Sequence, residues 1–334
     1  MSKNKSSNIN KRVINNKKLK NILFLLISFF IIEVNRYVNF CFNCINKITN
    51  NNCLKCSNAC IFKDIQIYND ETTLNEIINK NKSITRIGDG EFFLINGKGI
   101  RFQDYNRNLS QRLLKILNSE ENNLLVGINL PYKKSLFNRF NEKTKKFYNL
   151  YFKKYRFILA QIIKKRKFFS AWISRFYMAY KSKKKVPRYI KHLKKIWDKK
   201  DIIIIEGKYS RLGIGNNLFD NVKSIQRIIC PTKNAFNKYE EILNITKKIV
   251  PKNKLILIAL GPTATLLAYD LSKLGFQSID IGHVDIEYEW YLRKAKTKIP
   301  IKNKYVSEVL KNKELSINVT DKNYYKQIIG TITD

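Results

Sequence analysis

The sequence has few histidines and few acidic residues. Only His192 and His283 occur in 334 residues, which excludes a site built on several imidazoles, so a metal would need carboxylate or cysteine ligands. Acidic residues number 26 against 64 lysines and arginines, a formal net charge of +38. Such a charge attracts the phosphates of nucleic acid, nucleotides or anionic lipids without choosing among them. The hydrophobic fraction of 44% argues against disorder of the whole chain.

The sequence also lacks a long hydrophobic run. The apolar stretch at 22–32 is shorter than the ~20 residues of a transmembrane helix, and Glu33 and Arg36 follow it at once. It fits a signal-peptide core, a weak signal anchor or an interfacial helix. The basic leader at 1–21 is expected to be disordered and to stay in the cytoplasm. We expect a cytoplasmic protein with peripheral contact at the inner face of the membrane. The alternative is insertion as a signal anchor, which would export the part of the chain that follows residue 32.

Five of the six cysteines lie close together near the N-terminus. Cys41 and Cys44 form one C-x-x-C pair, Cys53 and Cys56 form a second, and Cys60 is left over. Such pairs occur in small structural zinc sites, although the spacer between them is shorter than in ordinary zinc ribbons. Reduced thiols and disulfides are equally compatible with the pattern. We assign this cluster no catalytic role.

The chain is predicted to divide into an N-terminal extension, residues 1–63, and a folded domain, residues 64–334. In the domain, short apolar strands alternate with segments of helical periodicity, which indicates an α/β fold with a mostly parallel sheet covered on both faces. The predicted strands are 83–87, 124–128, 202–205, 224–230, 255–260 and 278–281, and the predicted helices are 72–82, 106–119, 236–249 and 263–274. Ligands of such sheets bind beyond the carboxyl ends of the strands.

The first strand-end motif is Arg-Ile-Gly-Asp-Gly-Glu at 86–91. In an extended stretch, residues two apart point to one face, so Asp89 and Glu91 would converge on one point. Gly90 permits close approach of the backbone, and Arg86 adds a positive charge. These groups suit a divalent metal that carries a diphosphate. The alternative is an ordinary Gly-Asp-Gly surface turn.

A glycine-rich loop follows the strand at 202–205. Arg211, Gly213 and Asn216 belong to this loop, whose backbone suits the approach of phosphate oxygens. It lacks both the G-x-G-x-x-G fingerprint and the P-loop G-K-[ST], which excludes an ordinary dinucleotide or Walker site.

The strand at 255–260 runs into Gly261, Pro262, Thr263, Ala264 and Thr265. Proline at a first helical position leaves free N–H groups at the helix start, and these groups with the two threonine hydroxyls form an anion site. Helix capping by threonine is the alternative.

The last strand leads into a run of chemically active side chains. His283 follows the strand end, where it suits a third metal ligand or a proton carrier, or has a structural role. Asp285 is a plausible helix N-cap, and Glu289 would then lie one turn further on the same face, with Glu287 between them.

Residues 139–183 interleave aromatic and basic side chains. This composition could bind nucleic acid or a membrane surface. We favour a pair of amphipathic helices packed on the sheet.

Together the four strand-end motifs resemble the GT-D-fold glycosyltransferases. The resemblance rests on the motifs at 86–91, 206–216, 261–265 and 280–290, in this order, with Ile-Ile-Cys-Pro at 228–231 and Asn-Ala at 234–235 between them. It covers the chain from about residue 70 to its end, and leaves the N-terminal extension outside.

The resemblance implies a Rossmann-like, doubly wound domain that uses a nucleotide-sugar donor, typically UDP-glucose, with a divalent metal such as Mn²⁺ or Mg²⁺. The family's Asp-x-Glu motif corresponds to Asp89 and Glu91, and His283 is the candidate third ligand. Its members act in surface glycoprotein or polysaccharide synthesis, so a glycan or glycoprotein acceptor is expected.

The remaining roles follow from the chemistry of sugar transfer. A leaving diphosphate must be neutralised, and an inverting transfer needs a base for the acceptor hydroxyl. The expected diphosphate and nucleotide contacts are Arg86, Arg211, Gly213, Asn216, Gly261, Thr263 and Thr265. Asp285 is the first candidate for the base, with Glu287 and Glu289 in reserve. The rival functions are a basic nucleic-acid-binding protein and a membrane-associated scaffold with an inactive nucleotide fold.

Overall fold

The computed structural model describes residues 57–164, 167–306, 308–309 and 321–333. The fold belongs to the compact unit Ile61–Asp334. The predictions for the stretch 22–32 and for Cys41, Cys44, Cys53 and Cys56 lie outside the described residues, and Cys60 is an exposed free thiol. In the described ranges no helix combines the length and the apolar content needed to cross a membrane.

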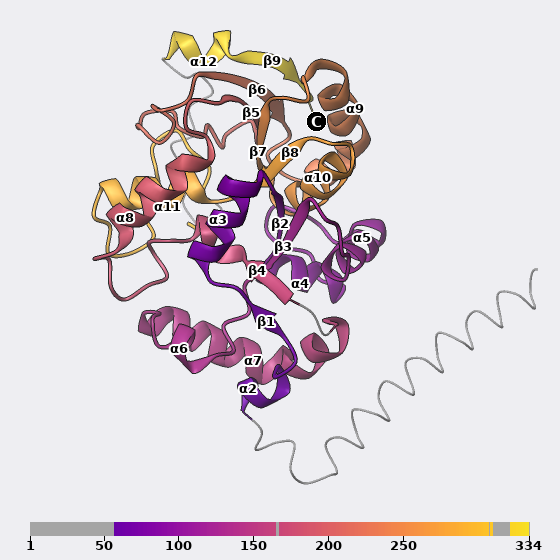
Figure 1. Ribbon diagram of the computed structural model, residues 1–334, viewed down its shortest axis with the longest axis vertical. Helices are drawn as coiled ribbons and strands as arrows, with labels where there is room; N and C mark the ends of the chain where they lie inside the picture. The colour runs from indigo at the N-terminus through magenta and orange to yellow at the C-terminus, as the bar shows by residue number, and fades with distance from the viewer. Residues whose placement is uncertain (1–56, 165–166, 307, 310–320, 334) are drawn as a thin grey trace, which may run out of the picture. The chain divides into compact units, whose positions relative to one another are not determined.

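A sheet whose strands all pair in parallel forms the centre of this unit (Figure 1). Within the described ranges it has nine strands in the order β1-β4-β3-β2-β8-β7-β5-β6-β9. Their bounds are Gln66–Ile67 (β1), Ser83–Ile87 (β2), Leu124–Ile128 (β3), Lys167–Ser170 (β4), Asp201–Gly207 (β5), Ser224–Cys230 (β6), Leu255–Ala259 (β7), Gln277–Asp280 (β8) and Ile328–Thr331 (β9). The predicted parallel α/β sheet is confirmed. β1, β4 and β9 were not predicted.

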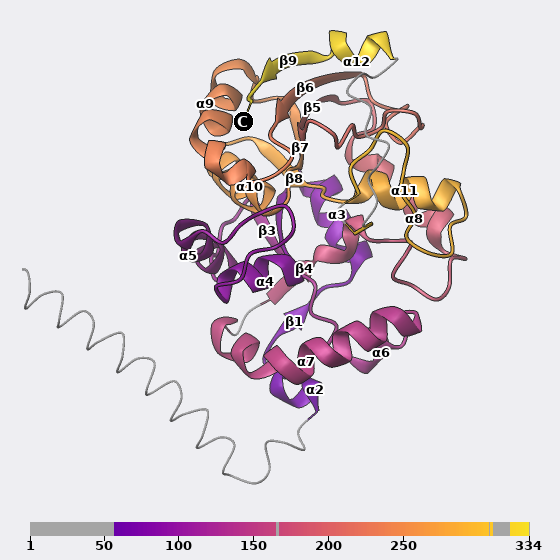
Figure 2. The same ribbon diagram turned by 180° about the vertical axis from the view of Figure 1, so that it is seen from behind.

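Helices cover both faces of the sheet. One face carries α4 (Asp89–Ile95), α5 (Arg107–Leu117), α9 (Tyr239–Ile249) and α10 (Pro262–Lys273), and the other carries α3 (Asp70–Lys80), α8 (Val186–Leu193) and α11 (Val284–Leu292) (Figures 1 and 2). The further helices are α2 (Asn58–Ile61), α6 (Lys134–Phe137), α7 (Glu142–Ile162) and α12 (Lys322–Lys326), with single 3₁₀ turns η1 (Ala171–Ser174), η2 (Lys194–Ile196) and η3 (Ala235–Lys238).

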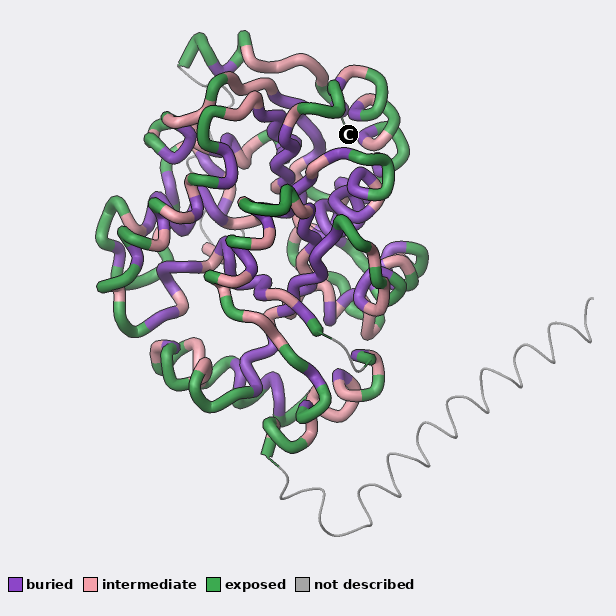
Figure 3. The backbone as a smooth tube through the Cα atoms, in the orientation of Figure 1, coloured by how far each residue is buried: buried purple, intermediate pink, exposed green. Residues whose placement is uncertain are grey.

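The strands divide the apolar core into two clusters. On β5, Ile203 and Ile205 face the cluster shared with α10, whereas Ile202 and Ile204 face the cluster shared with α8. All four are fully buried, because side chains alternate between the faces of a strand that is covered on both sides. Figure 3 shows the central strands as the most continuously buried part of the described backbone.

The two halves of the sheet meet where β2 pairs with β8 through Ile84 and Ile279. From β2 the chain continues to β3 and β4, away from β8, whereas from β8 it proceeds to β9 at the opposite edge. The connections after these two neighbouring strands therefore run in opposite directions. A crevice at the carboxyl ends of such strands is the usual ligand site of an open α/β sheet.

The basic and aromatic stretch at 139–183 is only partly helical. Its first part forms the amphipathic helix α7, in which Tyr148, Tyr151 and Phe152 are buried. The second predicted helix is wrong, because Phe168 and Phe169 lie on β4 and Trp172 lies on η1. The large aromatic side chains that nucleic acid could have stacked on are therefore mostly part of the core.

Candidate functional site

Asp89 and Glu91 lie at the carboxyl end of β2, in the first turn of α4. The expectation of an extended stretch is wrong, because Glu91 closes the helix start: its Oε2 accepts a hydrogen bond from the Gly88 N–H at 2.8 Å. In a helix, residues two apart point to nearly opposite sides. The two carboxylates therefore meet different partners, although they remain close enough to affect each other's charge.

Glu91 is held in an unfavourable environment for a negative charge. Burial is the main cause that raises the pKa of Glu91 to about 7, and the nearby carboxylates of Asp280 and Asp89 also raise it. The hydrogen bond from the Gly88 N–H lowers the pKa but does not outweigh them. Glu91 therefore loses its proton most easily when a cation arrives beside it.

Asp89 faces the strand next to β2 and the aromatic side of α7. Its Oδ1 accepts a hydrogen bond from Asn129 Nδ2 at 3.1 Å, and Asn129 directly follows β3. The pKa values of Tyr148 and Tyr151 are raised, mainly by burial and secondly by the negative charge of Asp89. The Tyr151 hydroxyl is buried and has no hydrogen-bond partner among the described residues.

Arg86 is occupied by protein groups. Its Nη2 pairs with Asp280 Oδ1 and its Nε donates to the Asp280 carbonyl, each at 2.8 Å. Its Nη1 donates to the Ala171 carbonyl at 3.1 Å and to Ser174 Oγ at 2.5 Å. Arg86 thus ties β2, β8 and η1 together, and its predicted contact with a diphosphate stays a prediction.

The glycine-rich loop after β5 is brought to α11, as the order of the sheet requires. Gly213 N–H and Asn216 Nδ2 both donate to Asp285 Oδ1, at 2.9 and 2.8 Å. Asn216 also donates to Glu289 Oε1 at 2.7 Å. Lys304 Nζ bridges the two carboxylates, at 2.6 Å from Asp285 and 3.0 Å from Glu289. These predicted nucleotide and base residues therefore meet, but they bind one another.

The three candidate bases are all buried on α11. Asp285 is not the N-cap that the sequence suggested, because the helix begins at Val284 and His283, two residues earlier, is the N-cap. Glu287 accepts hydrogen bonds from the N–H groups of Tyr177 and Met178, at 2.8 and 2.7 Å. In this arrangement the three carboxylates hold loops in place, and their role as bases is untested.

His283 is paired away from the Asp-x-Glu motif. Its Nε2 lies 3.1 Å from Glu308 Oε2, and Arg175 Nη1 lies 2.5 Å from the other oxygen of the same carboxylate. Burial and the charge of Arg175 lower the pKa of His283. Among the described residues, no three His, Cys, Asp or Glu side chains are grouped as a ready-made metal site. A metal at Asp89 and Glu91 would therefore need ligands from its substrate.

The start of α10 lies at the same edge, beside β2. Gly261 is the N-cap with a φ of 54°, and a Cβ there would come within 2.3 Å of the Phe102 ring. Thr265 Oγ1 donates to the Arg86 carbonyl at 2.9 Å. The Thr263 hydroxyl is fully buried and lacks a partner among the residues the structure describes. Arg211, in the next loop along the sheet, donates from Nη1 to the Asn303 carbonyl at 2.9 Å.

Several residues of the site were not predicted from the sequence. They are Asn129, Arg175, Asp280, Lys304 and Glu308. Asn129 and Asp280 stand at strand ends, so the rule for parallel sheets could have included them. Lys304 and Glu308 come from an irregular segment after α11, and no periodicity or motif indicates their partners.

Comparison with known proteins identifies close relatives. A family model described as "Glycosyltransferase GT-D fold" matches residues 84–309. The chain is 35% identical over 270 residues to "Probable glycosyl transferase Gly" of Streptococcus gordonii, and 35% identical over 268 residues to "Glycosyltransferase GlyD" of Streptococcus pneumoniae serotype 4. These matches cover 81% and 80% of this chain but only 39% and 33% of the two relatives.

Solved structures give the same picture. One, described as showing that domain of unknown function 1792 "has a distinct glycosyltransferase fold", superposes with a TM-score of 0.78 at 37% identity, covering 83% of this chain and all of that one. Another, "A New Glycosyltransferase (DUF1792) from Streptococcus sanguinis", gives a TM-score of 0.77 at 34% identity, covering 80% of this chain and all of that one.

Proposed function

Because the chain belongs to the family of GT-D-fold glycosyltransferases, we propose that it transfers a hexose from a UDP-sugar, such as UDP-glucose, to a glycan or glycoprotein acceptor in surface polysaccharide or glycoprotein synthesis. One observation carries the proposal. Asp89 and Glu91 stand just beyond the carboxyl end of β2, next to β8, where open parallel sheets bind their ligands.

Each of the two carboxylates suits a divalent metal that arrives with a diphosphate, although their side chains leave α4 in different directions. Mg²⁺ and similar ions are commonly held by one or two carboxylates together with substrate phosphates and water. Asp89 accepts a hydrogen bond from Asn129 and Glu91 accepts one from Gly88, so each keeps lone pairs for a cation. When bound, Mn²⁺ or Mg²⁺ would neutralise charge on the leaving diphosphate.

The nucleotide is proposed to lie across the start of α10. The hydroxyl of Thr263, which is buried and lacks a partner among the described residues, offers a donor for a phosphate oxygen. Pro262 has no N–H, and the Ala264 N–H already donates to the Gly261 carbonyl at 3.0 Å. The close approach of Phe102 to Gly261 leaves no room for a side chain at that N-cap. The other predicted nucleotide residues would keep the surrounding loops in position through the bonds described above, namely Arg86, Arg211, Gly213, Asn216 and Thr265.

The candidate bases for the acceptor hydroxyl all lie in buried networks on α11. Asp285, Glu287 and Glu289 remain the candidates, but a base must come within hydrogen-bond reach of the proton it removes. Each is buried and already paired with a loop or with Lys304. We therefore propose that they position the glycine-rich loop and residues 177–178, and that any catalytic part requires these loops to open.

Peripheral contact with a membrane is proposed for the outer face of α7. Phe147 and Leu150 are 41% and 62% exposed, and Lys143, Lys146 and Lys153 are exposed around them. Exposed apolar side chains among lysines suit a bilayer with anionic lipids, because the apolar groups enter the interface and the charges meet the headgroups.

The test of the proposed function is UDP release from UDP-sugars by the full chain, with Mn²⁺, with Mg²⁺ and with EDTA. We expect metal-dependent release that falls by about a hundredfold or more in Asp89→Asn and Glu91→Gln, since charge neutralisation in the transition state is lost. Glu240→Gln, an exposed acid on α9, is the matched control and should leave the rate unchanged. Release that is equal in both variants and in wild type would refute the metal assignment.

A further inference from the structure

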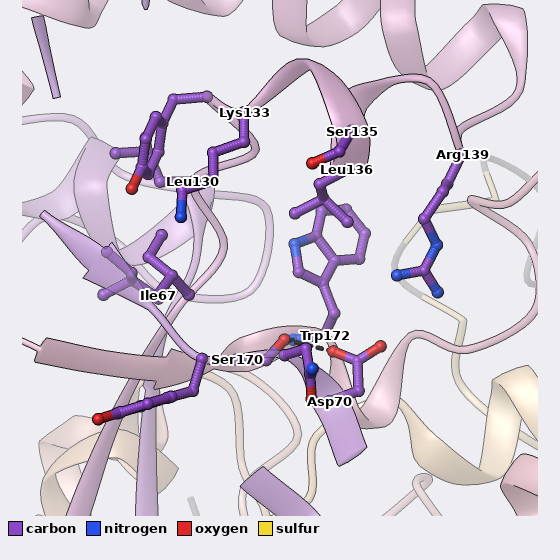
Figure 4. Close-up of a pocket in the computed structure, with 13 residues that line it drawn as sticks. Ile67, Asp70, Leu130, Lys133, Ser135, Leu136, Arg139, Ser170 and Trp172 are labelled. Carbon is purple, nitrogen blue, oxygen red and sulfur yellow. Dashed lines mark hydrogen bonds between the residues drawn. The ribbon is translucent and has the colours of Figure 1, made fainter. Parts of the chain in front are cut away.

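A separate pocket of about 270 Å³ opens at the carboxyl edge of β1, β4 and β3, away from α10 and the loop after β5 (Figure 4). The residues that line it follow the ends of these three strands. Pockets that enclose a drug-sized ligand usually measure ~300–1,000 Å³. This pocket is therefore too small for a whole nucleotide-sugar, but it has room for a single sugar ring.

Aromatic rings form much of the lining. Trp172 and Tyr132 are buried, and Tyr68 closes another side. The Tyr132 hydroxyl is already used, because it donates to the Ile65 carbonyl. Its ring and that of Trp172 therefore offer mainly apolar surface, which packs well on the C–H face of a pyranose.

One polar group in the pocket lacks a partner. The Trp172 side chain is more than nine-tenths buried, yet its indole Nε1 makes no hydrogen bond within the described residues. Figure 4 shows this nitrogen turned toward the interior of the pocket, on the side of Leu130 and Ile67. A buried N–H of this kind normally has an acceptor, so a ligand oxygen is its natural partner.

Charged groups stand on the far side of the same pocket. The carboxylate of Asp70 accepts hydrogen bonds from Ser170 Oγ at 2.5 Å and Tyr180 OH at 3.5 Å, and keeps lone pairs for another donor. Arg139 lies opposite it in Figure 4, with its guanidinium stacked on the Tyr180 ring at 5.0 Å. A carboxylate and a guanidinium facing each other across a gap can hold hydroxyls, which donate to one and accept from the other.

The pocket adjoins the Asp-x-Glu motif through a single residue. Ile128 and Leu130 line the pocket, and Asn129 between them donates to Asp89. On the other side, the Tyr148 ring lies 5.9 Å from that of Trp172. A sugar ring held in the pocket would thus lie beside Asp89 and Glu91, the proposed metal ligands, without competing for them.

We propose that this pocket binds a hexopyranose unit of the acceptor, packed on Trp172 and Tyr132, with hydroxyls bonded to Asp70, Arg139 and Trp172 Nε1. The inference rests on the proposed glycosyl transfer, and it adds the substrate class that the acceptor side recognises. The small volume disfavours the alternative occupant, the nucleotide-sugar donor with its diphosphate.

The test uses the full chain labelled with ¹⁵N at tryptophan, because three tryptophans give three indole signals. Trp172→Phe assigns the Trp172 signal. The probes are methyl glycosides of glucose, galactose and N-acetylglucosamine, titrated to tens of millimolar, and separately UDP with Mn²⁺. We expect at least one glycoside to shift the Trp172 signal selectively and saturably, and UDP with Mn²⁺ to bind independently of it.

Two variants probe the polar groups. Asp70→Asn keeps the shape of a half-buried side chain, and Arg139→Gln changes an exposed one. Each should weaken glycoside binding by about tenfold, the size of one hydrogen bond to a charged group, and leave the affinity for UDP and Mn²⁺ unchanged. Arg188→Gln, an exposed arginine on α8, is the control.

The outcomes separate the two proposals. Absence of any glycoside effect on Trp172, or equal binding by wild type, Asp70→Asn and Arg139→Gln, would overturn the acceptor pocket while UDP binding stands. Loss of UDP binding in Asp70→Asn would assign the pocket to the donor and overturn it as well. Absence of UDP binding by the wild type would instead refute the proposed function, whatever the glycosides do.

Discussion

Arg86 and Asp280 form a largely buried ion pair that joins the two halves of the sheet where β2 and β8 lie side by side. The guanidinium meets both the side chain and the backbone carbonyl of Asp280, each at 2.8 Å. Gly282, two residues further on, lies against this pair: a Cβ there would be 1.9 Å from Arg86 Nη2. The sequence motif Ile-Gly-His thus has its glycine because Arg86 occupies the space of a side chain.

The first prediction concerns this contact. Gly282→Ala should destabilise the protein more than Gly275→Ala, although both glycines have a positive φ, because a Cβ at Gly275 meets open space. We expect the unfavourable backbone alone to cost about 1–2 kcal/mol at Gly275. Disruption of the buried pair should add about 2–4 kcal/mol at Gly282. Urea denaturation of the two variants measures both values, and equal losses would contradict the contact.

The second prediction concerns the protonation of Glu91. Its pKa is raised to about 7 in the folded protein from an ordinary value near 4.5, so the folded state binds the proton more tightly than the unfolded state. The stability that this proton contributes is fully present below pH ~4.5 and is lost as the pH rises through about 7. The loss is at most about 3 kcal/mol, reduced because Glu91 is partly exposed.

The measurement is urea denaturation of metal-free protein from pH 5 to pH 8, for wild type and Glu91→Gln. The difference between them isolates Glu91 from the other titrating groups, and glutamine preserves the helix start. Wild type should lose stability relative to the variant across this range. Parallel curves would show that Glu91 has an ordinary pKa. Addition of Mn²⁺ should then stabilise wild type most at the upper end of the range.

The sequence predicted the sheet well, because its central strands are buried on both faces and form continuous apolar runs. Ile202 to Ile205 is such a run, and all four residues lie within β5. The strands that were missed are short or at the sheet's edges, where burial is partial and the pattern is weak. β1 has two residues, and β4 begins with an exposed lysine within a basic stretch.

The sequence predicted which loops follow the carboxyl ends of the strands, but it did not predict the contacts that these loops make. Local patterns do indicate which loops follow which strands. They do not indicate that Asp285 would bind the Gly213 N–H, or that Lys304 would enter from an irregular segment. Asp89 and Glu91 were expected to converge as in a strand. The local rule that decided otherwise, a glutamate at the third helical position, was also present in the sequence.

The third prediction concerns the buried network on α11. Lys304→Met should leave Asp285 and Glu289 as buried carboxylates without their shared cation, and should cost about 3–5 kcal/mol. Burial raises the pKa of Glu289, but Lys304 and Asn216 together outweigh it and hold the pKa below its usual range. The variant should therefore lose most stability at neutral pH and recover part of it on acidification. Lys302→Met, an exposed neighbour, is the control, and similar losses in thermal unfolding of both variants would contradict the prediction.

The fourth prediction concerns the exposed apolar residues of α7. Leu150→Asn and Phe147→Ser should each weaken binding to vesicles of phosphatidylglycerol and phosphatidylcholine by about five- to thirtyfold, because each loses about 1–2 kcal/mol of apolar burial in the bilayer. Leu292→Asn removes an apolar side chain that is 45% exposed on α11, and should have no effect. Co-sedimentation at low and high salt measures the change. Because lysines surround the two residues, binding should also weaken with salt and vanish on vesicles without anionic lipid. If Leu292→Asn lowers binding as much as Leu150→Asn does, the face of α7 is not the contact.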